Sequence, residues 1–567
     1  MGRRDANPAR DQEEETTEVK TGGRMDMGTT KPSQSYWPAD TTRAIMNVSI
    51  GRALATAAAE VPDRIALIEV VPASVPSPVG AAQANRRWTY AQLQEDASRC
   101  ASWLLGKFKT GDRICVWAPN VPEWMVLQYG AALAGVILVT ANPAFKPSEL
   151  EFVLRQSRAS ALFHLSSFRG VDTGAIARDM EKIGLECYSF EGWLQAIRST
   201  PATALPEIDP GHAAQIQYTS GTTGRPKGAL LHHRGLVTNA SHVAARAGLE
   251  DSILLSPMPL FHTAGSVMSV LGCVTSRATL VLPLFFDPPT VLQAIEATRA
   301  EIMFGVPTML LALIDAMKAV PRDLSSLRLA LSGGAPVSPE IHRRVKQALG
   351  LPVVTVYGQT ELSPIVAQTS IDDPEAELVH TVGKPLWNVE LRIVDPIDLR
   401  VLPIGYEGEI QARGYQTMIG YFEAPEDTRQ AITADGWLRT GDLGKLDERG
   451  YLRVTGRLKD MIIRGGENIY PVEIEACLLR HPDVADAAVF GAPDERWGEV
   501  VAAAVRLSPN ASLSADQLTE HCRAAMAHHK TPTLWFVCTE FPLTASGKVQ
   551  KFRLREALAS GQLDVLA

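Results

Sequence analysis

The sequence predicts an α/β protein: a large N-terminal domain of parallel sheets sandwiched by helices, with a β-rich subdomain near its end, and a small α+β C-terminal domain. Three observations predict this fold. Apolar strand-like segments alternate with helical ones over residues 64–165 and 213–360, which is typical of βαβ units and parallel sheets. Over 389–412 and 450–463 the segments are shorter and interrupted by glycine, which favours antiparallel pairing. A small mixed pattern of helices and strands follows residue 465.

The first third of the chain contains four helical patterns, each followed by a strand pattern. The helix that begins near residue 89 has a capping box, because Thr89 and Gln92 have the spacing that lets each side chain bond the other residue's backbone. Residues 72–85 are rich in Pro, Ala, Ser and Gly and indicate a loop. The sequence predicts helices over 49–60, 89–105, 122–135 and 146–158, and strands over 64–70, 113–117, 136–140 and 159–165.

Later segments complete the two domains. An apolar run over 279–286 is too short to cross a bilayer and indicates a buried strand. In the C-terminal part we expect helices over 471–480 and 514–527 and strands over 485–490 and 500–507. The predicted organisation is a disordered tail over 1–38, a large domain over 39–458 and a small domain over 459–567, with the boundary near Lys459.

Composition and charge exclude several classes of protein. With 55 Lys and Arg against 63 Asp and Glu, the formal charge is −8, so nucleic acid is not expected as the main partner. Residues 1–34 contain no Leu, Ile, Phe, Tyr or Trp, so no signal peptide is expected, and no apolar run suits an integral membrane segment. The seven scattered cysteines form no C-x-x-C pair and fit a reducing compartment, so we expect a cytoplasmic protein. Histidine pairs at 232–233 and 528–529 lack a Cys, Asp or Glu cluster and indicate structural or exposed positions.

Residues 218–228 (YTSGTTGRPKG) are the most informative stretch. They follow the apolar strand pattern at 213–217 and combine glycines, four hydroxyls and a lysine. Glycines let a backbone turn tightly so that N–H groups can surround an anion, and the hydroxyls and lysine add further donors. The stretch lacks the G-x-x-x-x-G-K-[ST] pattern of common nucleotide-binding loops. It nevertheless predicts a phosphate-binding loop, with the candidate residues Thr219, Ser220, Gly221, Thr222, Thr223, Gly224 and Lys227.

Five further motifs follow in a fixed order. They are 331–336 (LSGGAP), 357–361 (YGQTE), 437–442 (WLRTGD), 456–468 (GRLKDMIIRGGEN) and 542–551 (PLTASGKVQK). Together with the phosphate loop, they resemble the adenylate-forming (AMP-binding) superfamily over about residues 45–560. Within it, the chain looks most like the acyl-CoA synthetases, in particular those for medium-chain fatty acids.

The resemblance implies a role for each motif. Lys548 is implied as the catalytic lysine, because a cation beside the α-phosphate stabilises the charge that builds there in the transition state. Lys459 is implied as the hinge about which the mobile small domain rotates, and Gly465 and Gly466 as the passage for the pantetheine arm of CoA. The implied ATP-binding and catalytic residues are Gly333, Gly334 and Ala335 on the adenine side, Tyr357 stacking on adenine, Thr360 at the α-phosphate, Glu361 as Mg²⁺ ligand, Asp442 at the ribose and Arg457 at the ribose or phosphate.

The residues expected to line the pocket for the substrate acid are 259–266 (PLFHTAGS) and the segments around 305 and 364. Relatives that activate amino acids have an aspartate near the place where Phe261 and His262 stand here. Without that counter-ion a buried ammonium group would cost several kcal/mol, so we expect a hydrophobic acid. The candidate acyl-pocket residues are Phe261, His262, Gly265, Gly305 and Val306. His262 either gates the pocket or contacts the carboxylate, or it is an ordinary buried histidine.

The resemblance implies an ATP-dependent, AMP-forming ligase of a carboxylic acid, with a medium-chain fatty acid as the expected substrate. Mg²⁺ would accompany ATP, CoA would be the co-substrate, and a homodimer is compatible with the sequence. Three alternatives stay open: a ligase for aryl or alicyclic acids, an acyl-AMP ligase that loads a carrier protein, and a catalytically silent binding protein on the same fold.

Overall fold

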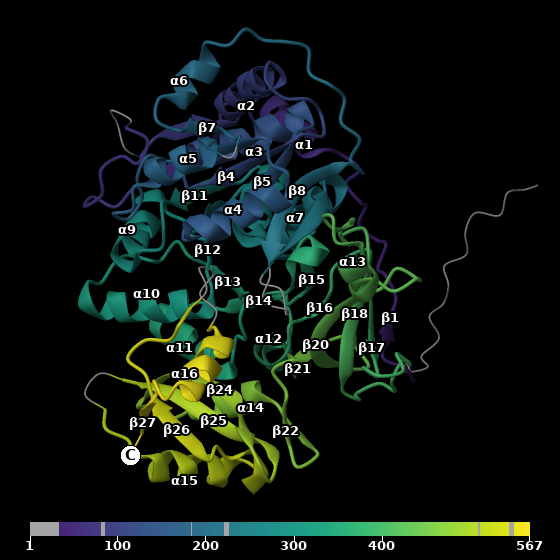
Figure 1. Ribbon diagram of the computed structural model, residues 1–567, viewed down its shortest axis with the longest axis vertical. Helices are drawn as coiled ribbons and strands as arrows, with labels where there is room; N and C mark the ends of the chain where they lie inside the picture. The colour runs from purple at the N-terminus through teal and green to yellow at the C-terminus, as the bar shows by residue number, and fades with distance from the viewer. Residues whose placement is uncertain are drawn as a thin grey trace, which may run out of the picture.

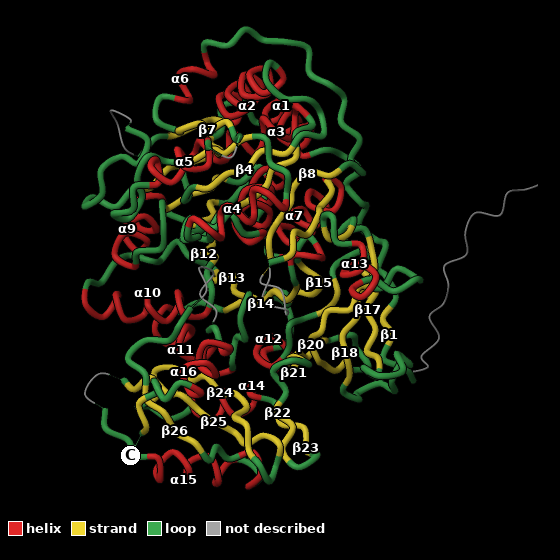
Figure 2. The backbone as a smooth tube through the Cα atoms, in the orientation of Figure 1, coloured by secondary structure: helices red, strands yellow, loops and turns green. Residues whose placement is uncertain are grey.

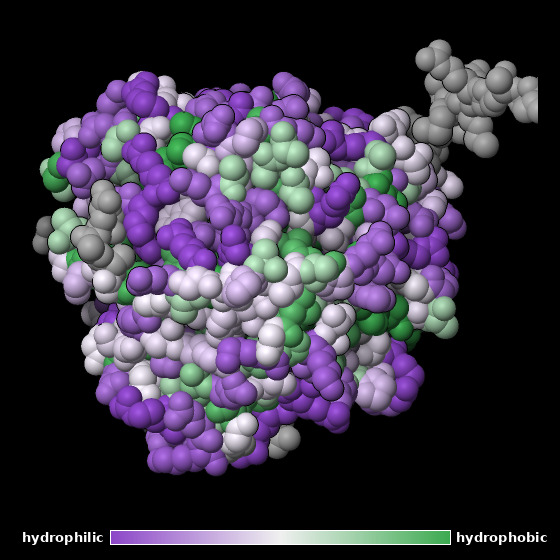
Figure 3. Space-filling model, turned by 90° about the horizontal axis from the view of Figure 1, so that it is seen from above, coloured by the Kyte–Doolittle hydropathy of each residue, from purple (hydrophilic) through white to green (hydrophobic). Residues whose placement is uncertain are grey.

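The computed structural model describes residues 33–80, 85–182, 184–219, 226–508, 511–543 and 549–566. It has the predicted α/β class: a large part with mixed helices and parallel strands, and a small C-terminal part that lies below it in Figure 1. Four sheets are formed, and Figure 2 shows how their strands lie among the helices. Seen from above in Figure 3, hydrophilic side chains cover most of the surface, with apolar ones scattered among them.

Two sheets of the large part carry the βαβ units predicted from the sequence. The seven-stranded sheet is parallel from β8 to β7, while β9 and β19 join its other edge in antiparallel orientation. Its strand order is β19 (Gly420–Tyr421), β9 (Lys227–His232), β8 (Ala213–Thr219), β5 (Ile137–Thr140), β4 (Arg113–Trp117), β6 (Ala161–His164) and β7 (Glu186–Ser189).

The nine-stranded sheet is parallel from β14 to β2. The strand predicted over 279–286 ends at Pro283, opposite Val70, the last residue of its neighbour β2. The order of the sheet is β16 (Lys384–Pro385), β15 (Ile365–Gln368), β14 (Val353–Gly358), β13 (Leu329–Gly333), β12 (Ile302–Phe304), β10 (Ile253–Leu255), β11 (Thr279–Pro283), β2 (Ile65–Val70) and β3 (Arg87–Thr89).

A layer of buried helices lies in the main core between these sheets. Helix α3 (Pro122–Ala134) is buried at all but one of its positions, as expected for a helix that is apolar all round. Thr89 and Gln92 form the predicted capping box at the start of α2. The remaining members of this layer are α1 (Ile50–Glu60), α2 (Tyr90–Leu105), α7 (His233–Arg246), a π-helix (Ala264–Leu271) and α8 (Gly272–Ser276).

Outer helices cover the remaining face of each of the two large sheets and form a separate hydrophobic core with it. Helix α4 (Pro147–Gln156) and α5 (Thr173–Glu181) pack on the seven-stranded sheet, and α9 (Pro288–Thr298), α10 (Pro307–Ala319) and α11 (Pro339–Leu349) pack on the nine-stranded sheet. The short helix α6 (Trp193–Arg198) lies at the top of the large part in Figure 1, and the short helix α12 (Glu375–His380) lies beside α11 and β14.

The β-rich subdomain is antiparallel, as the sequence predicts. It consists of β1 (Tyr36–Trp37), β17 (Val389–Val394), β18 (Gly408–Gly414), β20 (Leu438–Leu446) and β21 (Leu452–Arg457), with α13 (Pro425–Ala431) beside it. Strand β1 lies inside the segment that we assigned to the tail, so ordered chain begins earlier than residue 39. Residues 1–32 of that segment lie outside the described residues.

The small part has a separate hydrophobic core around Ile469, Val489 and Val505. Its predicted helices are present, and its two central strands are longer than the sequence suggests. The elements are β22 (Ile462–Arg464), β23 (Glu467–Ile469), α14 (Pro471–Leu478), β24 (Val484–Asp494), β25 (Gly498–Leu507), α15 (Ala515–Ala525), β26 (Leu534–Val537), α16 (Lys551–Ala559) and β27 (Asp564–Val565). Lys459 lies in the link 458–461 between β21 and β22.

All seven cysteines are free thiols. Five are buried, whereas Cys187 on β7 and Cys538 just after β26 are partly exposed. In the part of the chain that the structure describes, no helix has both the length and the apolar character required to cross a membrane.

Candidate active site

The candidate site lies where parallel strands of both large sheets end. Strands β12, β13 and β14 run in the same direction, so the segments after Phe304, Gly333 and Gly358 meet at one edge of the nine-stranded sheet. Strand β8 of the other sheet ends at Thr219, immediately before the predicted phosphate loop. In open α/β sheets ligands bind at the carboxyl ends of the strands.

Two predicted nucleotide residues converge on a buried carboxylate. Tyr357 at the end of β14 donates its hydroxyl to Asp442 Oδ2 at 2.9 Å, and Arg457 Nε donates to Asp442 Oδ1 at 2.8 Å. Asp442 is only 4% exposed, and Asp442 and Arg457 face each other across the β20–β21 pair. The neighbouring charge of Asp442 raises the pKa of Arg457. Burial, followed by the charge of Asp442, raises the pKa of Tyr357, so its hydroxyl stays a donor at neutral pH.

A second buried carboxylate lies beside the start of the phosphate loop. Glu361 is 9% exposed and belongs to the short 3-10 helix Thr360–Leu362. Its Oε1 accepts a hydrogen bond from the Tyr421 hydroxyl at 2.7 Å and a longer one from Thr219 Oγ1 at 3.4 Å. The predicted metal ligand is therefore held by groups from two other strands.

The arrangement around Glu361 suits a magnesium ion that arrives with ATP. Among the described residues there is no group of three or more His, Cys, Asp and Glu that could hold a metal alone. Mg²⁺ usually binds one or two protein carboxylates and completes its shell with phosphate oxygens and water. One buried carboxylate beside the predicted phosphate loop fits that requirement, and a bound ion would neutralise part of the phosphate charge.

Lys227, the predicted phosphate lysine, forms an ion pair with Asp427. Its Nζ lies 2.5 Å from Asp427 Oδ1 and 5.4 Å from the centre of the Tyr421 ring. The pKa of Lys459 is lowered, first by partial burial and then by the positive charges of Lys227 and Arg457. The predicted hinge residue therefore lies close to the cations of the site.

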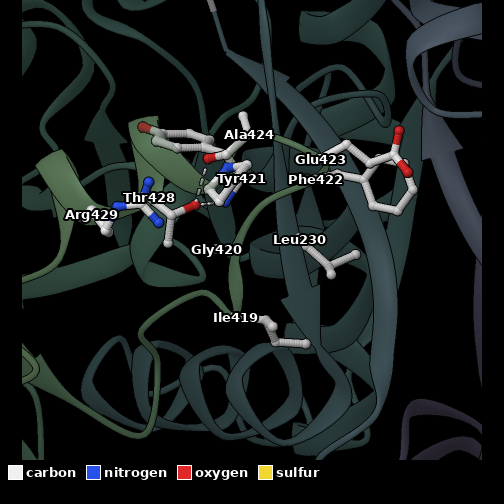
Figure 4. A pocket seen from close by; sticks show the side chains of 10 residues that line it. Leu230, Ile419, Gly420, Tyr421, Phe422, Glu423, Ala424, Thr428 and Arg429 are labelled. Atoms are coloured by element: carbon white, nitrogen blue, oxygen red, sulfur yellow. Dashed lines mark hydrogen bonds between the residues drawn. The ribbon is translucent and has the colours of Figure 1, made fainter.

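The segment that carries Tyr421 is anchored by its own hydrogen bonds. Figure 4 labels several residues of this segment, among them Tyr421 and Thr428, and the Tyr421 amide donates to Thr428 Oγ1 at 2.9 Å. Tyr421 also faces Ala229 in the β19–β9 pair, which fixes it beside the start of β9. Tyr421, Thr428 and several of their neighbours also line an open hollow of about 450 Å³.

The glycines of the predicted adenine-side motifs are explained by backbone packing. A side chain at Gly333 would place its Cβ 2.4 Å from the Val356 carbonyl oxygen. At Gly358 the Cβ would come still closer to the Pro364 carbonyl oxygen. Gly334 has a φ of +79°, a conformation that favours glycine, and turns the chain after β13. Ala335 follows in that turn.

Part of the predicted acyl pocket lies beside the end of β5. The Phe261 carbonyl accepts a hydrogen bond from Thr140 Oγ1 at 2.8 Å, and the His262 ring caps a backbone N–H two residues ahead at 3.2 Å. Gly265 is packed so closely that a Cβ would lie 2.2 Å from the Pro259 carbonyl oxygen. His262 itself is half-buried.

The other acyl-pocket candidates lie at the end of β12. Gly305 donates its N–H to the Leu331 carbonyl at 3.1 Å, and Val306 is 2% exposed at the start of α10. They therefore share the strand-end edge with the adenine-side glycines.

The predicted CoA passage is not part of this cluster. Gly465 and Gly466 form the turn of the β22–β23 hairpin, which lies at the lower right of the small part in Figure 2. Both have positive φ, and a Cβ at Gly465 would come within 2.6 Å of the Trp497 ring. Other predicted residues lie outside the described residues: Ser220, Gly221, Thr222, Thr223, Gly224 and the catalytic candidate Lys548.

The histidine pair after the phosphate loop has a structural role, as predicted. His232 caps helix α7 by accepting from Gly235 N, and His233 is 1% exposed and accepts from Ile50 N at 3.4 Å. In the second pair His528 is exposed at the start of the 3-10 helix His528–Lys530.

Two residues of the site were missed by sequence reasoning. Tyr421 and Asp427 lie 60 and 200 residues from their partners Glu361 and Lys227. Tyr421 lies in a two-residue strand and Asp427 in the first turn of a short helix, and such short elements give no clear periodic signal. These partners become visible only when β19 is seen to pair with β9.

Comparisons with known proteins identify the family to which this chain is similar. The family model described as AMP-binding enzyme matches residues 54–422, and the AMP-binding enzyme C-terminal domain matches 473–548. YngI of Bacillus subtilis (strain 168), which bears the name of an acyl-CoA synthetase, is 37% identical over 90% of this chain and 97% of its own. The mitochondrial medium-chain acyl-CoA ligase ACSF2 of Danio rerio is 33% identical over 92% of this chain and 90% of its own. The structure of the anthranilate CoA ligase AuaEII with anthranoyl-AMP is similar with a TM-score of 0.82 and 27% identity, covering 91% of this chain and 98% of that one.

Proposed function

The chain belongs to the family of AMP-binding enzymes, and from this premise we propose that it joins a medium-chain fatty acid to CoA through an acyl-adenylate. The relatives identify the general activity as that of an AMP-forming acid–CoA ligase. The observation that carries the proposal is the convergence of two networks at the strand ends. One joins Tyr357 and Arg457 to Asp442, and the other joins Tyr421 to Glu361 beside Lys227.

In the first half-reaction the substrate carboxylate attacks the α-phosphorus of ATP, and pyrophosphate leaves. Asp442 accepts hydrogen bonds from the ribose hydroxyls, which suits a carboxylate with two acceptor oxygens. Tyr357 stacks on the adenine, and Thr360 donates to the α-phosphate. Lys227 binds the departing phosphates, and Lys548 stabilises the charge that develops at the α-phosphate.

In the second half-reaction the thiolate of CoA attacks the acyl carbonyl carbon, and AMP leaves. The small domain first rotates about Lys459, which withdraws Lys548 and brings the Gly465–Gly466 turn to the site. The position of that turn in the β22–β23 hairpin of the small part, and not at the strand ends of the large sheets, supports such a movement.

The substrate class rests on the residues around the acyl pocket. Phe261 and His262 supply no carboxylate for a substrate ammonium group, and Val306 adds an apolar side chain. These features favour a hydrophobic acid. Similarity to a medium-chain acyl-CoA ligase supports a fatty acid of that length.

A second candidate substrate is an aryl or alicyclic acid. The similarity to the anthranilate CoA ligase structure favours it, because that enzyme shares the fold over nearly its whole length. An acyl-AMP ligase that transfers to a carrier protein would differ from both in not using free CoA.

Mass spectrometry of the products tests these possibilities together. The protein would receive Mg·ATP and a mixture of short, medium, long, aromatic and alicyclic acids, with and without CoA. We expect acyl-CoA only when CoA is present, with the medium-chain mass dominant. Accumulation of acyl-AMP without any thioester would contradict the CoA assignment, and a dominant aromatic or alicyclic product would replace the fatty acid.

A further inference from the structure

Lys227, the predicted phosphate-binding lysine, already forms an ion pair with Asp427 of the same chain. We propose that Asp427 competes with the phosphates for Lys227 and thereby weakens the binding of pyrophosphate, which promotes its release after adenylation. This inference rests on the proposed function, because it takes Lys227 as a ligand of the phosphates that leave.

Strand β19 and helix α13 position Asp427 next to Lys227. Strand β19 pairs with β9, the strand that begins with Lys227, and it leads directly into α13. Asp427 lies in the first turn of α13. The hydroxyl of Thr428 in the same turn accepts from the Tyr421 amide, so the backbone at Asp427 stays next to β19 even when the carboxylate rotates away from the lysine.

The charges around the pair make the competition effective. Lys227 lies close enough to Lys459 to lower its pKa, and Arg457 acts on Lys459 in the same direction. This concentration of positive charge would hold a polyanionic product tightly. A carboxylate that neutralises Lys227 reduces that attraction once the phosphate moves away.

The pair is also exposed enough to open. The Lys227 and Asp427 side chains are 18% and 34% exposed, so water can solvate both groups while they are apart. Partly exposed ion pairs are weak, and a multiply charged phosphate can therefore displace the carboxylate when ATP binds.

The test compares Asp427→Asn with Glu426→Gln in the full-length protein. Glu426 is the preceding residue, its side chain is 71% exposed, and it pairs with Arg429 instead of Lys227. The two variants remove the same charge from the same helix turn. We expect Asp427→Asn to lower both the KM for Mg·ATP and the inhibition constant of pyrophosphate by about three- to fivefold, the factor that opening a partly exposed ion pair typically costs. Glu426→Gln should leave both near wild type, and Asp427→Glu should restore weak pyrophosphate inhibition.

Several outcomes would overturn the proposal. Unchanged or weaker pyrophosphate inhibition in Asp427→Asn would show that the carboxylate does not compete. Equal effects of both substitutions would indicate a general effect of charge. If the wild-type protein forms acyl-CoA and Asp427→Asn has the same KM for Mg·ATP and the same pyrophosphate inhibition, the competition is rejected and the proposed function stays intact. If Asp427→Asn is unstable in a thermal unfolding control, Asp427→Ala, which also removes the carboxylate, supplies the comparison. Pyrophosphate inhibition that is the same in Asp427→Ala as in the wild type would reject the role.

Discussion

Replacing Tyr421 by phenylalanine should selectively damage adenylate formation. The change removes only the hydroxyl that donates to Glu361 at 2.7 Å, and the ring beside Lys227 stays. Thr219, at 3.4 Å, would be the remaining donor to that oxygen in the described contacts. A hydrogen bond to a charged acceptor contributes about 1.5–3 kcal/mol. If the full contribution is expressed in the transition state, kcat/KM for Mg·ATP in the first half-reaction should fall by about 10- to 150-fold.

The two half-reactions are assayed separately. Pyrophosphate release reports adenylation, and formation of acyl-CoA from preformed acyl-AMP reports the second step, which should stay within about twofold of wild type. Tyr36→Phe is a matched control because Tyr36 donates to Glu390 at the same 2.7 Å, far from the site. The reasoning would be refuted if Tyr421→Phe adenylated at the wild-type rate, if Tyr36→Phe had the same effect, or if both half-reactions fell equally.

Three further predictions concern the catalytic lysine, the hinge and the stability of the protein. Lys548→Ala should reduce pyrophosphate release by at least about a hundredfold, as loss of a transition-state charge contact does, and largely spare thioester formation from acyl-AMP; equal loss of both would reject its role. Lys459→Pro stiffens the link at φ and should slow the second half-reaction far more than the first, so an unchanged second step would argue against the hinge. Burial lowers the pKa of His233 to about 4. In the unfolded chain this imidazole binds a proton below its ordinary pKa of 6.5, whereas in the folded protein it stays neutral down to about pH 4. The free energy of unfolding should therefore fall as the pH is lowered from 6.5 towards 4, by up to about 1.4 kcal/mol per pH unit for this residue. Urea denaturation at pH 7.5, 6 and 5 measures this slope, which should be smaller in His233→Gln, and identical slopes would show that His233 does not contribute.

Local sequence patterns predicted much of the large domain. Alternating apolar segments identified the strands, and Thr89 with Gln92 identified the start of α2, because these features depend on neighbours within one element. The family resemblance also implied that Tyr357, Asp442 and Arg457 share one site, and the structure joins their side chains.

Long-range pairings were beyond local patterns. Strand β1 has two residues and pairs with a strand more than 350 positions away, so the sequence around Tyr36 does not predict this pairing. The same holds for Tyr421 in β19. The run Ala264–Leu271 is apolar at a helical spacing, but that pattern does not distinguish the observed π-helix from an α-helix.

The two partly exposed cysteines allow the distance between the large part and the small part to be measured with dyes attached to native residues. Cys187 lies in the large part and Cys538 in the small part, while the other five thiols are buried. Burial raises the pKa of Cys187 to about 11 and also raises that of Cys538, so maleimide dyes would react slowly at neutral pH and faster in mild alkali. A donor and an acceptor fluorophore on these native positions would report the separation of the two parts during turnover, without any engineered residue.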